Sequence, residues 1–223
     1  MSELVFKKLW AELFDYAGAD VIPGDWQAAY ERTIAPYNDL SRSYHNLDHV
    51  EEMVLYLYDY PGWPLTAIGQ REKFTAIAAA FFHDYVDPRS PEAELLSAEA
   101  CLREMMSWGI VKPTTHLMVI ATNASKAILT TKDHVGYSVV EQMLIDADLQ
   151  RFVTGDWRVW ANQIRLEYAD VPEALFNEGR LAVLERFRSR SPFFYLAQHQ
   201  DCEAYRRLDE QIAECKRLIA EAG

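Results

Sequence analysis

Apolar residues recur at spacings of three and four along most of the chain, which is the pattern of amphipathic helices. The stretch MSELVFKKLWAELFDY at residues 1–16 predicts a first helix. Its apolar face would hold Leu4, Phe6, Leu9, Trp10, Leu13 and Phe14. A second helix is predicted after Pro23 and Gly24, with Asp25 as its cap and Pro36 near its end. Because the alternation typical of strands is scarce, we expect an all-α fold.

One apolar run differs from the amphipathic pattern. The sequence FTAIAAAFF, starting at Phe74, is hydrophobic on every side of a helix and too short to span a membrane. It predicts a helix inside the core that ends at His83 and Asp84. A buried imidazole and carboxylate cost free energy unless they are paired or hold a cation. Most His-Asp pairs are ordinary surface features, so a metal site here depends on what else the fold brings nearby.

The segment HNLDH contains two of the six histidines, His45 and His49. If the helix already runs through Asn46, both rings lie on one helical face. If Asn46 or Asp48 caps the helix, His45 belongs to the preceding loop, and this is the geometry we expect. His49 would then lie on the buried side of the first turn. Taken alone, the segment is more typical of a polar helix start than of a metal site, and the His-Asp pair at the end of a buried helix makes the two interpretations about equal.

A third polar cluster ends the predicted helix YSVVEQMLIDADL at residues 137–149. Its two carboxylates, Asp146 and Asp148, are unfavourable at the negative end of the helix dipole and would not be buried without compensation. A cation would compensate both. A solvated helix end is the alternative.

The remaining helices are predicted from the spacing of their apolar residues and from the glycine and proline residues that begin or end helices. A helix would open at Ser90 or Pro91 and end at Gly109, and another would begin at Pro113 with His116 near its start. Ser97 on the first of these helices is expected to face solvent, the alternative being that it approaches the candidate site. Residues 126–134, which include His134, are polar and predicted to be a loop. Two further helices follow in residues 156–171 and 172–190, and a charged helix from about 201 to 221 comes after a break at Ser191-Pro192.

Composition narrows the class of protein. The chain has 223 residues, half of them hydrophobic, which is enough to bury a core, and we expect one domain over residues 1–223. The formal net charge of -12 disfavours unaided binding to nucleic acid or an anionic membrane. We therefore expect neither as a partner.

The cysteines, the N-terminus and the length of the apolar runs bear on the cellular compartment. Three widely spaced cysteines without a C-x-x-C pair, Cys101, Cys202 and Cys215, are typical of reduced thiols in the cytosol. The N-terminus lacks a basic segment followed by an apolar stretch, and no run reaches about 18 apolar residues. We expect a cytoplasmic protein without a transmembrane span.

The order of these motifs resembles the HD-domain superfamily of metal-dependent phosphohydrolases, an all-α fold named for its His-Asp doublet. The resemblance implies that His49, His83, Asp84 and Asp148 are metal ligands. Asp148 is preferred because the residues around it look like the A-D-x-L ending of related hydrolases. Asp146 would be a second-shell residue or an alternative ligand.

The segments YHNLDH, FFHDYVD, LIDADL, IRLEY and EGR-x-x-VL-x-x-F are similar, in order, to a bacterial subgroup of predicted HD phosphohydrolases. This resemblance covers about residues 41–190. Two segments depart from the subgroup. Residues 121–125 lack its usual histidine, which disfavours a second metal ion, and residues 206–209 read RRLD where the subgroup has A-R-x-N, which removes an expected substrate contact.

The resemblance implies a hydrolase for a small phosphorylated molecule, a nucleotide being the expected class. A divalent Mn, Fe, Co, Ni, Zn or Mg ion would activate a bound water for attack on phosphorus. Asp84 would serve as ligand and proton acceptor. His45, Arg165 and Arg180 are the candidates for holding the phosphate and stabilising charge in the transition state.

Other classes remain open. The chain could bind or sense a nucleotide without hydrolysing it, serve a purely structural role, or act as a metal-dependent oxygenase, since related HD folds hold two irons. The substrate would be chosen by pocket-forming residues such as Tyr44, Tyr85, Trp108 and Tyr168. The sequence discloses neither the substrate nor whether the chain forms a homo-oligomer.

Overall fold

The computed structural model describes residues 3–17, 25–63, 67–108, 115–131 and 138–222. Every regular element in these ranges is a helix, which confirms the all-α prediction. None of the described helices combines the length and the apolar character needed to cross a bilayer. The chain divides into two compact units, residues 1–147 and 148–223. The expectation of one domain over the whole chain stays a prediction.

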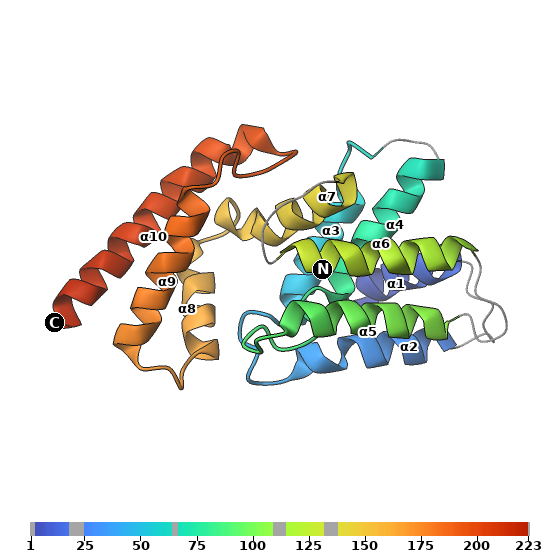
Figure 1. Ribbon diagram of the computed structural model, residues 1–223, viewed down its shortest axis with the longest axis horizontal. Coiled ribbons are helices and arrows are strands. Elements are labelled where there is room, and N and C mark those ends of the chain that lie inside the picture. The colour runs from blue at the N-terminus through green and yellow to red at the C-terminus, as the bar shows by residue number, and fades with distance from the viewer. Residues whose placement is uncertain (1–2, 18–24, 64–66, 109–114, 132–137, 223) are drawn as a thin grey trace. The chain divides into compact units, whose positions relative to one another are not determined.

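The N-terminal unit is built around α4 (Figure 1). Its helices are α1 (Glu3–Tyr16), α2 (Asp25–Ile34), η1 (Ala35–Asn38), α3 (Leu47–Asp59), α4 (Ala67–Phe82), α5 (Ala93–Ser107), α6 (Thr115–Thr131) and α7 (Val139–Asp148). Helix α4 contacts α1, α2, α3, α5 and α6, and α5 runs beside α6. A helical segment with neighbours on all sides must be apolar all round, which is what residues 74–82 of α4 show, whereas residues 70–73 (QREK) are polar.

The C-terminal half of α4 is fully buried. Residues 76–82, AIAAAFF, are all 0% exposed. The alanines let neighbouring helices approach closely, while Phe81 fills the space beside α1. Its ring centroid lies 4.9 Å from that of Phe6 and 4.7 Å from that of Trp10. The predicted core helix is therefore present, and it ends directly before His83.

Three local predictions in this unit are wrong. Residues 126–131 continue α6 instead of forming a loop, because Ala127 and Ile128 are completely buried and outweigh their polar neighbours. Ser97 is completely buried, and its hydroxyl accepts a hydrogen bond from the Val86 amide at 3.0 Å. Helix α5 begins at Ala93, because the preceding residues form a turn in which the Ala93 amide donates to the Ser90 carbonyl.

Several predicted boundaries cannot be compared with the structure. Pro23, Gly24, Gly109 and Pro113 lie outside the described residues, as do His134 and the side chain of His116.

The C-terminal unit contains η2 (Leu149–Phe152), α8 (Trp157–Glu167), α9 (Glu173–Arg188), η3 (Gln198–Gln200) and α10 (Asp201–Ala222). Helices α9 and α10 lie side by side (Figure 1). The break predicted at Ser191-Pro192 is a cis peptide bond, and the following Phe193 is fully buried. The Asp201 carboxylate accepts hydrogen bonds from the amides of Phe193 and Phe194 at 3.1 and 3.0 Å, which fastens this loop to the start of α10.

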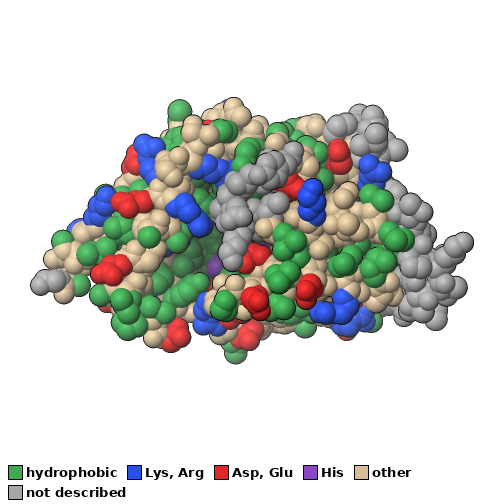
Figure 2. Space-filling view, viewed as in Figure 1, with side chains coloured by type: hydrophobic (Ala, Val, Ile, Leu, Met, Phe, Trp, Pro, Cys, Tyr) green, Lys and Arg blue, Asp and Glu red, His purple; other side chains and the backbone are tan. Residues whose placement is uncertain are grey.

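Charges on α10 are paired with one another. Arg206 contacts Glu203 and Glu210, and Arg217 contacts Glu214 and Glu221. Figure 2 shows basic and acidic side chains interspersed over the visible surface of this unit. Most charges of this helix therefore have an ordinary structural explanation.

Candidate metal centre

The Asn46 side chain caps α3 and sets the position of His49. Its oxygen accepts hydrogen bonds from the amides of Asp48 and His49 at 3.1 and 3.3 Å. The helix therefore starts after Asn46, and His45 precedes it, as we expected. His49 is only 1% exposed, and its ring stacks on Tyr44 with centroids 5.1 Å apart.

His83 and Asp84 follow the last residue of α4. The Nδ1 atom of His83 lies 2.9 Å from the Ala80 carbonyl oxygen. Because a carbonyl only accepts, this nitrogen carries the proton, and a neutral ring presents an unprotonated Nε2. That Nε2 lies 2.9 Å from Oδ2 of Asp84. An imidazole lone pair and a carboxylate at this distance repel each other unless a proton or a metal ion compensates them.

The Asp84 carboxylate faces three imidazoles. Its Oδ2 lies 3.9 Å from Nε2 of His45 and 4.0 Å from Nε2 of His49, in addition to the contact with His83. Burial by itself raises the pKa of Asp84, but the three histidines, when their rings are protonated, together outweigh burial and hold this pKa well below its usual range. Asp84 is therefore ionised at neutral pH and available to a cation.

Arg42 supports the turn that carries Asp84. It is 8% exposed, and its guanidinium donates to the backbone carbonyls of Asp84 at 2.6 Å and Tyr85 at 3.0 Å. The Tyr37 ring lies 5.3 Å below the guanidinium carbon, and its hydroxyl donates to the Phe81 carbonyl at 3.0 Å. Sequence reasoning missed Arg42, because an arginine near a histidine motif does not reveal a partner so far along the chain.

His49, His83 and Asp148 form a cluster whose ligand atoms all lie within 4.8 Å of one another. The two histidines are buried, and Asp148, the last residue of α7, is half-buried. Ligand atoms about 2.0–2.2 Å from a zinc-like ion are at most about 4.4 Å apart, so this spacing is close to that of a filled site. The structure thus brings together three of the four ligands that the resemblance implied, with Asp84 beside His83.

Asp146 occupies a different environment from Asp148. It is fully buried and is not part of the cluster formed by the two histidines and Asp148. Burial and, next, the charge of Asp146 raise the pKa of Tyr56 on α3, which places the Asp146 carboxylate near that tyrosine. A second-shell role for Asp146 stays a prediction.

The two predicted phosphate-binding arginines belong to the C-terminal unit. Arg165 donates to the carbonyls of Tyr168 at 2.5 Å and Val171 at 3.2 Å, and Arg180 donates to Oε1 of Gln211 at 3.3 Å. These contacts lie within that unit, and the role of both arginines at the metal cluster stays a prediction.

Two of the residues expected to shape a substrate pocket differ in their surroundings. Trp108 is 2% exposed and packs on Trp10 and Phe14 with ring centroids 5.2 and 4.9 Å away, so it belongs to the aromatic core. Tyr44, by contrast, lies directly against His49 and contributes to the wall of the metal cluster.

Comparison with known proteins adds no assignment, because no protein-family model, no curated protein and no solved structure matches this chain. The likeness to HD phosphohydrolases therefore rests on the sequence motifs.

Proposed function

We propose that this chain is a metal-dependent phosphohydrolase that acts on a small phosphorylated molecule, with nucleotides as the first class to test. One observation carries the proposal: two buried imidazoles and an aspartate from three separate helical segments converge within 4.8 Å. Three residues distant in sequence have no packing reason to place their polar atoms together, and burial makes the arrangement costly without a cation. A bound cation would offset this cost, because it would interact directly with the buried imidazoles and the aspartate.

The donor set suits a divalent cation of intermediate softness. His49, His83, Asp84 and Asp148 would hold Mn, Fe, Co, Ni, Zn or Mg, the nitrogen ligands favouring the transition metals over Mg. A bound ion of this kind supplies Lewis-acid polarisation of a phosphate ester and lowers the pKa of water to near neutrality.

The protein's own residues have distinct tasks in this proposal. Asp84, whose carboxylate faces three imidazoles, is the candidate proton acceptor. His45 is 19% exposed and stands 3.9 Å from Asp84, so its ring is placed to hydrogen-bond a phosphate oxygen entering from solvent. Arg42 keeps the Asp84 turn in place from the buried side. The Tyr44 ring, which stacks on His49, would limit how a substrate approaches this histidine.

The deciding experiment measures metal content and phosphate release on the same preparations. Wild type, His83→Ala and Asp148→Ala would be loaded with Mn or Ni, desalted and analysed by plasma mass spectrometry, then assayed with nucleoside mono- and triphosphates. We expect about one ion per chain in wild type and background levels in both variants, since each variant removes one ligand. The matched control is Asp170→Ala, which removes an exposed carboxylate of the C-terminal unit and should change neither quantity.

The outcomes separate the competing classes. Metal retention with phosphate release supports the hydrolase. Metal retention and nucleotide-induced stabilisation without release would identify a sensor, and substrate turnover that consumes oxygen would identify an oxygenase. Phosphate release by metal-free protein at the wild-type rate would refute the proposal, and the absence of metal under all loading conditions would leave a structural role.

A further inference from the structure

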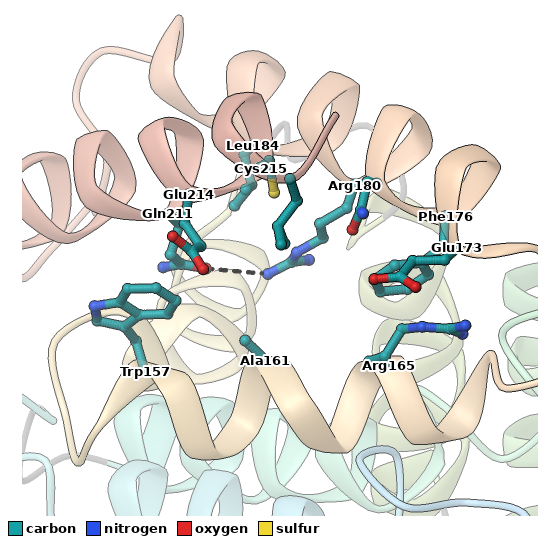
Figure 3. A pocket seen from close by; sticks show the side chains of 12 residues that line it. Trp157, Ala161, Arg165, Glu173, Phe176, Arg180, Leu184, Gln211, Glu214 and Cys215 are labelled. Atoms are coloured by element: carbon teal, nitrogen blue, oxygen red, sulfur yellow. Dashed lines mark hydrogen bonds between the residues drawn. The ribbon is translucent and has the colours of Figure 1, made fainter. Parts of the chain in front are cut away.

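The C-terminal unit contains a pocket that the proposed hydrolase does not use. It has a volume of about 160 Å³ and lies where α8, α9 and α10 meet (Figure 3). Trp157, Ala161 and Arg165 come from α8, whereas Phe176 and Arg180 come from α9. The α10 helix contributes Gln211, Glu214, Cys215 and Leu218. A cavity of about 150 Å³ is enough for a molecule the size of benzene, so the pocket suits a small organic compound.

Gln211 is the unusual polar residue of this pocket. It is 2% exposed, and among the described residues its Nε2 atom has no hydrogen-bond partner. Its Oε1 accepts from the Arg180 guanidinium at 3.3 Å, the contact drawn as a dashed line in Figure 3. Because a guanidinium only donates, the amide must turn its oxygen toward Arg180 and keep an N–H donor for something else. A buried donor without an acceptor is unfavourable, which points to a ligand that brings one.

Arg180 sets the charge of that ligand. Its guanidinium points along the pocket toward Gln211 and stacks on the Trp160 ring, 5.2 Å from the ring centroid. The guanidinium of Arg180 and the remaining N–H of the Gln211 amide are two donors that the pocket offers to a carboxylate. Glu173 and Glu214 also line the pocket, so a dianion such as phosphate would meet about twice the repulsion that a monoanion meets.

Apolar groups form much of the rest of the lining. Trp157 and Leu184 are 8% and 0% exposed, and Ala161, Phe176 and Leu218 add hydrocarbon surface. The buried Cys215 thiol has a raised pKa, chiefly from desolvation, and therefore stays protonated and unreactive. The lining thus favours reversible binding of an acid with a compact apolar body.

We propose that this pocket binds a small organic monocarboxylic acid, with the carboxylate at Arg180 and Gln211 and the hydrocarbon part against Trp157 and Leu184. The argument uses residues of the C-terminal unit alone and does not rest on the proposed hydrolase. A His83→Ala variant without metal should bind the acid as wild type does, so failure of either proposal can be recognised separately.

The test is a ligand-observed NMR titration of the full chain with acetate, isobutyrate and benzoate. Benzyl alcohol serves as the neutral match of benzoate, and inorganic phosphate as the small anion without an apolar body. We expect at least one acid to bind saturably with a dissociation constant below about 10 mM, and benzyl alcohol to bind about tenfold more weakly because it lacks the charge that the donors recognise.

Gln211→Glu is the informative substitution. The new carboxylate keeps an acceptor for Arg180, so the fold should persist, but it replaces the N–H donor by a negative charge. We expect binding of the acid to weaken by about tenfold or more, whereas Gln198→Glu, the same change at an exposed residue of this unit, should leave it unchanged. Thermal unfolding of both variants verifies the fold. Ala161→Leu, which fills the pocket, should weaken binding of the acid and the alcohol alike.

Four results would overturn the proposal: no binding by any of the three acids, equal binding of benzyl alcohol and benzoate, equal affinity for inorganic phosphate, or wild-type affinity in Gln211→Glu. Equal affinity for phosphate would identify a general anion site, and equal affinity for the alcohol an apolar cavity.

Discussion

The polar side chains of the two units are arranged differently. In the N-terminal unit, the carboxylate of Asp84 has three imidazole nitrogens within 2.9 to 4.0 Å, in a position with little solvent. On α10 of the C-terminal unit, guanidinium groups have their own carboxylates close by in the same helix and are exposed, as with Arg217 and its two glutamates. Convergence of several buried groups on one point indicates a site, whereas exposed ion pairs between residues three and four apart on one helix indicate solubility and local helix support.

The largest expected effect comes from breaking the convergent cluster at its centre. Asp84→Ala removes the one carboxylate that contacts all three histidines. We expect metal retention and phosphate release to fall to background, because a single ligand carboxylate, Asp148, would then be left to compensate the charge of a dication. Plasma mass spectrometry and a phosphate-release assay measure both. Asp84→Asn, which keeps the size and removes the charge, should behave almost the same, and wild-type metal content in either variant would contradict the role of Asp84.

A smaller effect is expected from the residue that holds the Asp84 turn. Arg42→Ala removes two hydrogen bonds, to the carbonyls of Asp84 and Tyr85, without touching the cluster. Outer residues of this kind change metal affinity by about 10- to 100-fold, and we expect a loss in that range. Competition titration with a metal indicator measures it. Arg89→Ala is the matched control, since Arg89 is an exposed arginine that pairs with Asp87, whereas Arg42 binds the carbonyls of Asp84 and Tyr85. Equal affinities for the two variants would show that Arg42 plays no part.

The N-cap of α3 should have a modest effect on stability. Asn46→Ala removes the acceptor for the amides of Asp48 and His49, at a cost of about 1 kcal/mol in the free energy of unfolding. Urea denaturation measures this cost. Asn46→Ser or Asn46→Asp should restore most of it, because both side chains accept from the same amides. A cost unchanged by these replacements would mean that the Asn46 amide acts through another contact, such as its own donation to the Ser43 carbonyl.

The smallest effect should come from the paired charges of α10. Arg217→Ala leaves Glu214 and Glu221 exposed to water, which solvates them well. We expect metal content and the urea midpoint to match those of wild type. A clear loss of stability would show that pairing on this helix matters more than solvent screening allows, and it would weaken the contrast between the two units.

Features decided within a few residues could be predicted well. The Asn46 cap needs only the amides that follow it, and the all-round apolar character of residues 74–82 predicts a helical segment with neighbours on every side. Predictions failed where a distant partner decided the outcome. Ser97 is buried because it accepts a hydrogen bond from the Val86 amide in an earlier loop, and residues 126–131 are helical because Ala127 and Ile128 find a core to fill.

The sequence by itself determined that the chain is helical, that the cap of α3 is Asn46 or Asp48, and that His83 and Asp84 stand at the end of a buried helix. These follow from hydrogen bonds and side-chain periodicity along one segment. The tertiary structure decided that His49, His83 and Asp148 share one point, that Arg42 supports Asp84, and that Arg180 meets Gln211 at the wall of a pocket. Such meetings depend on how separate helices pack, because side-chain spacing along one helix sets which face a residue occupies but not what that face contacts.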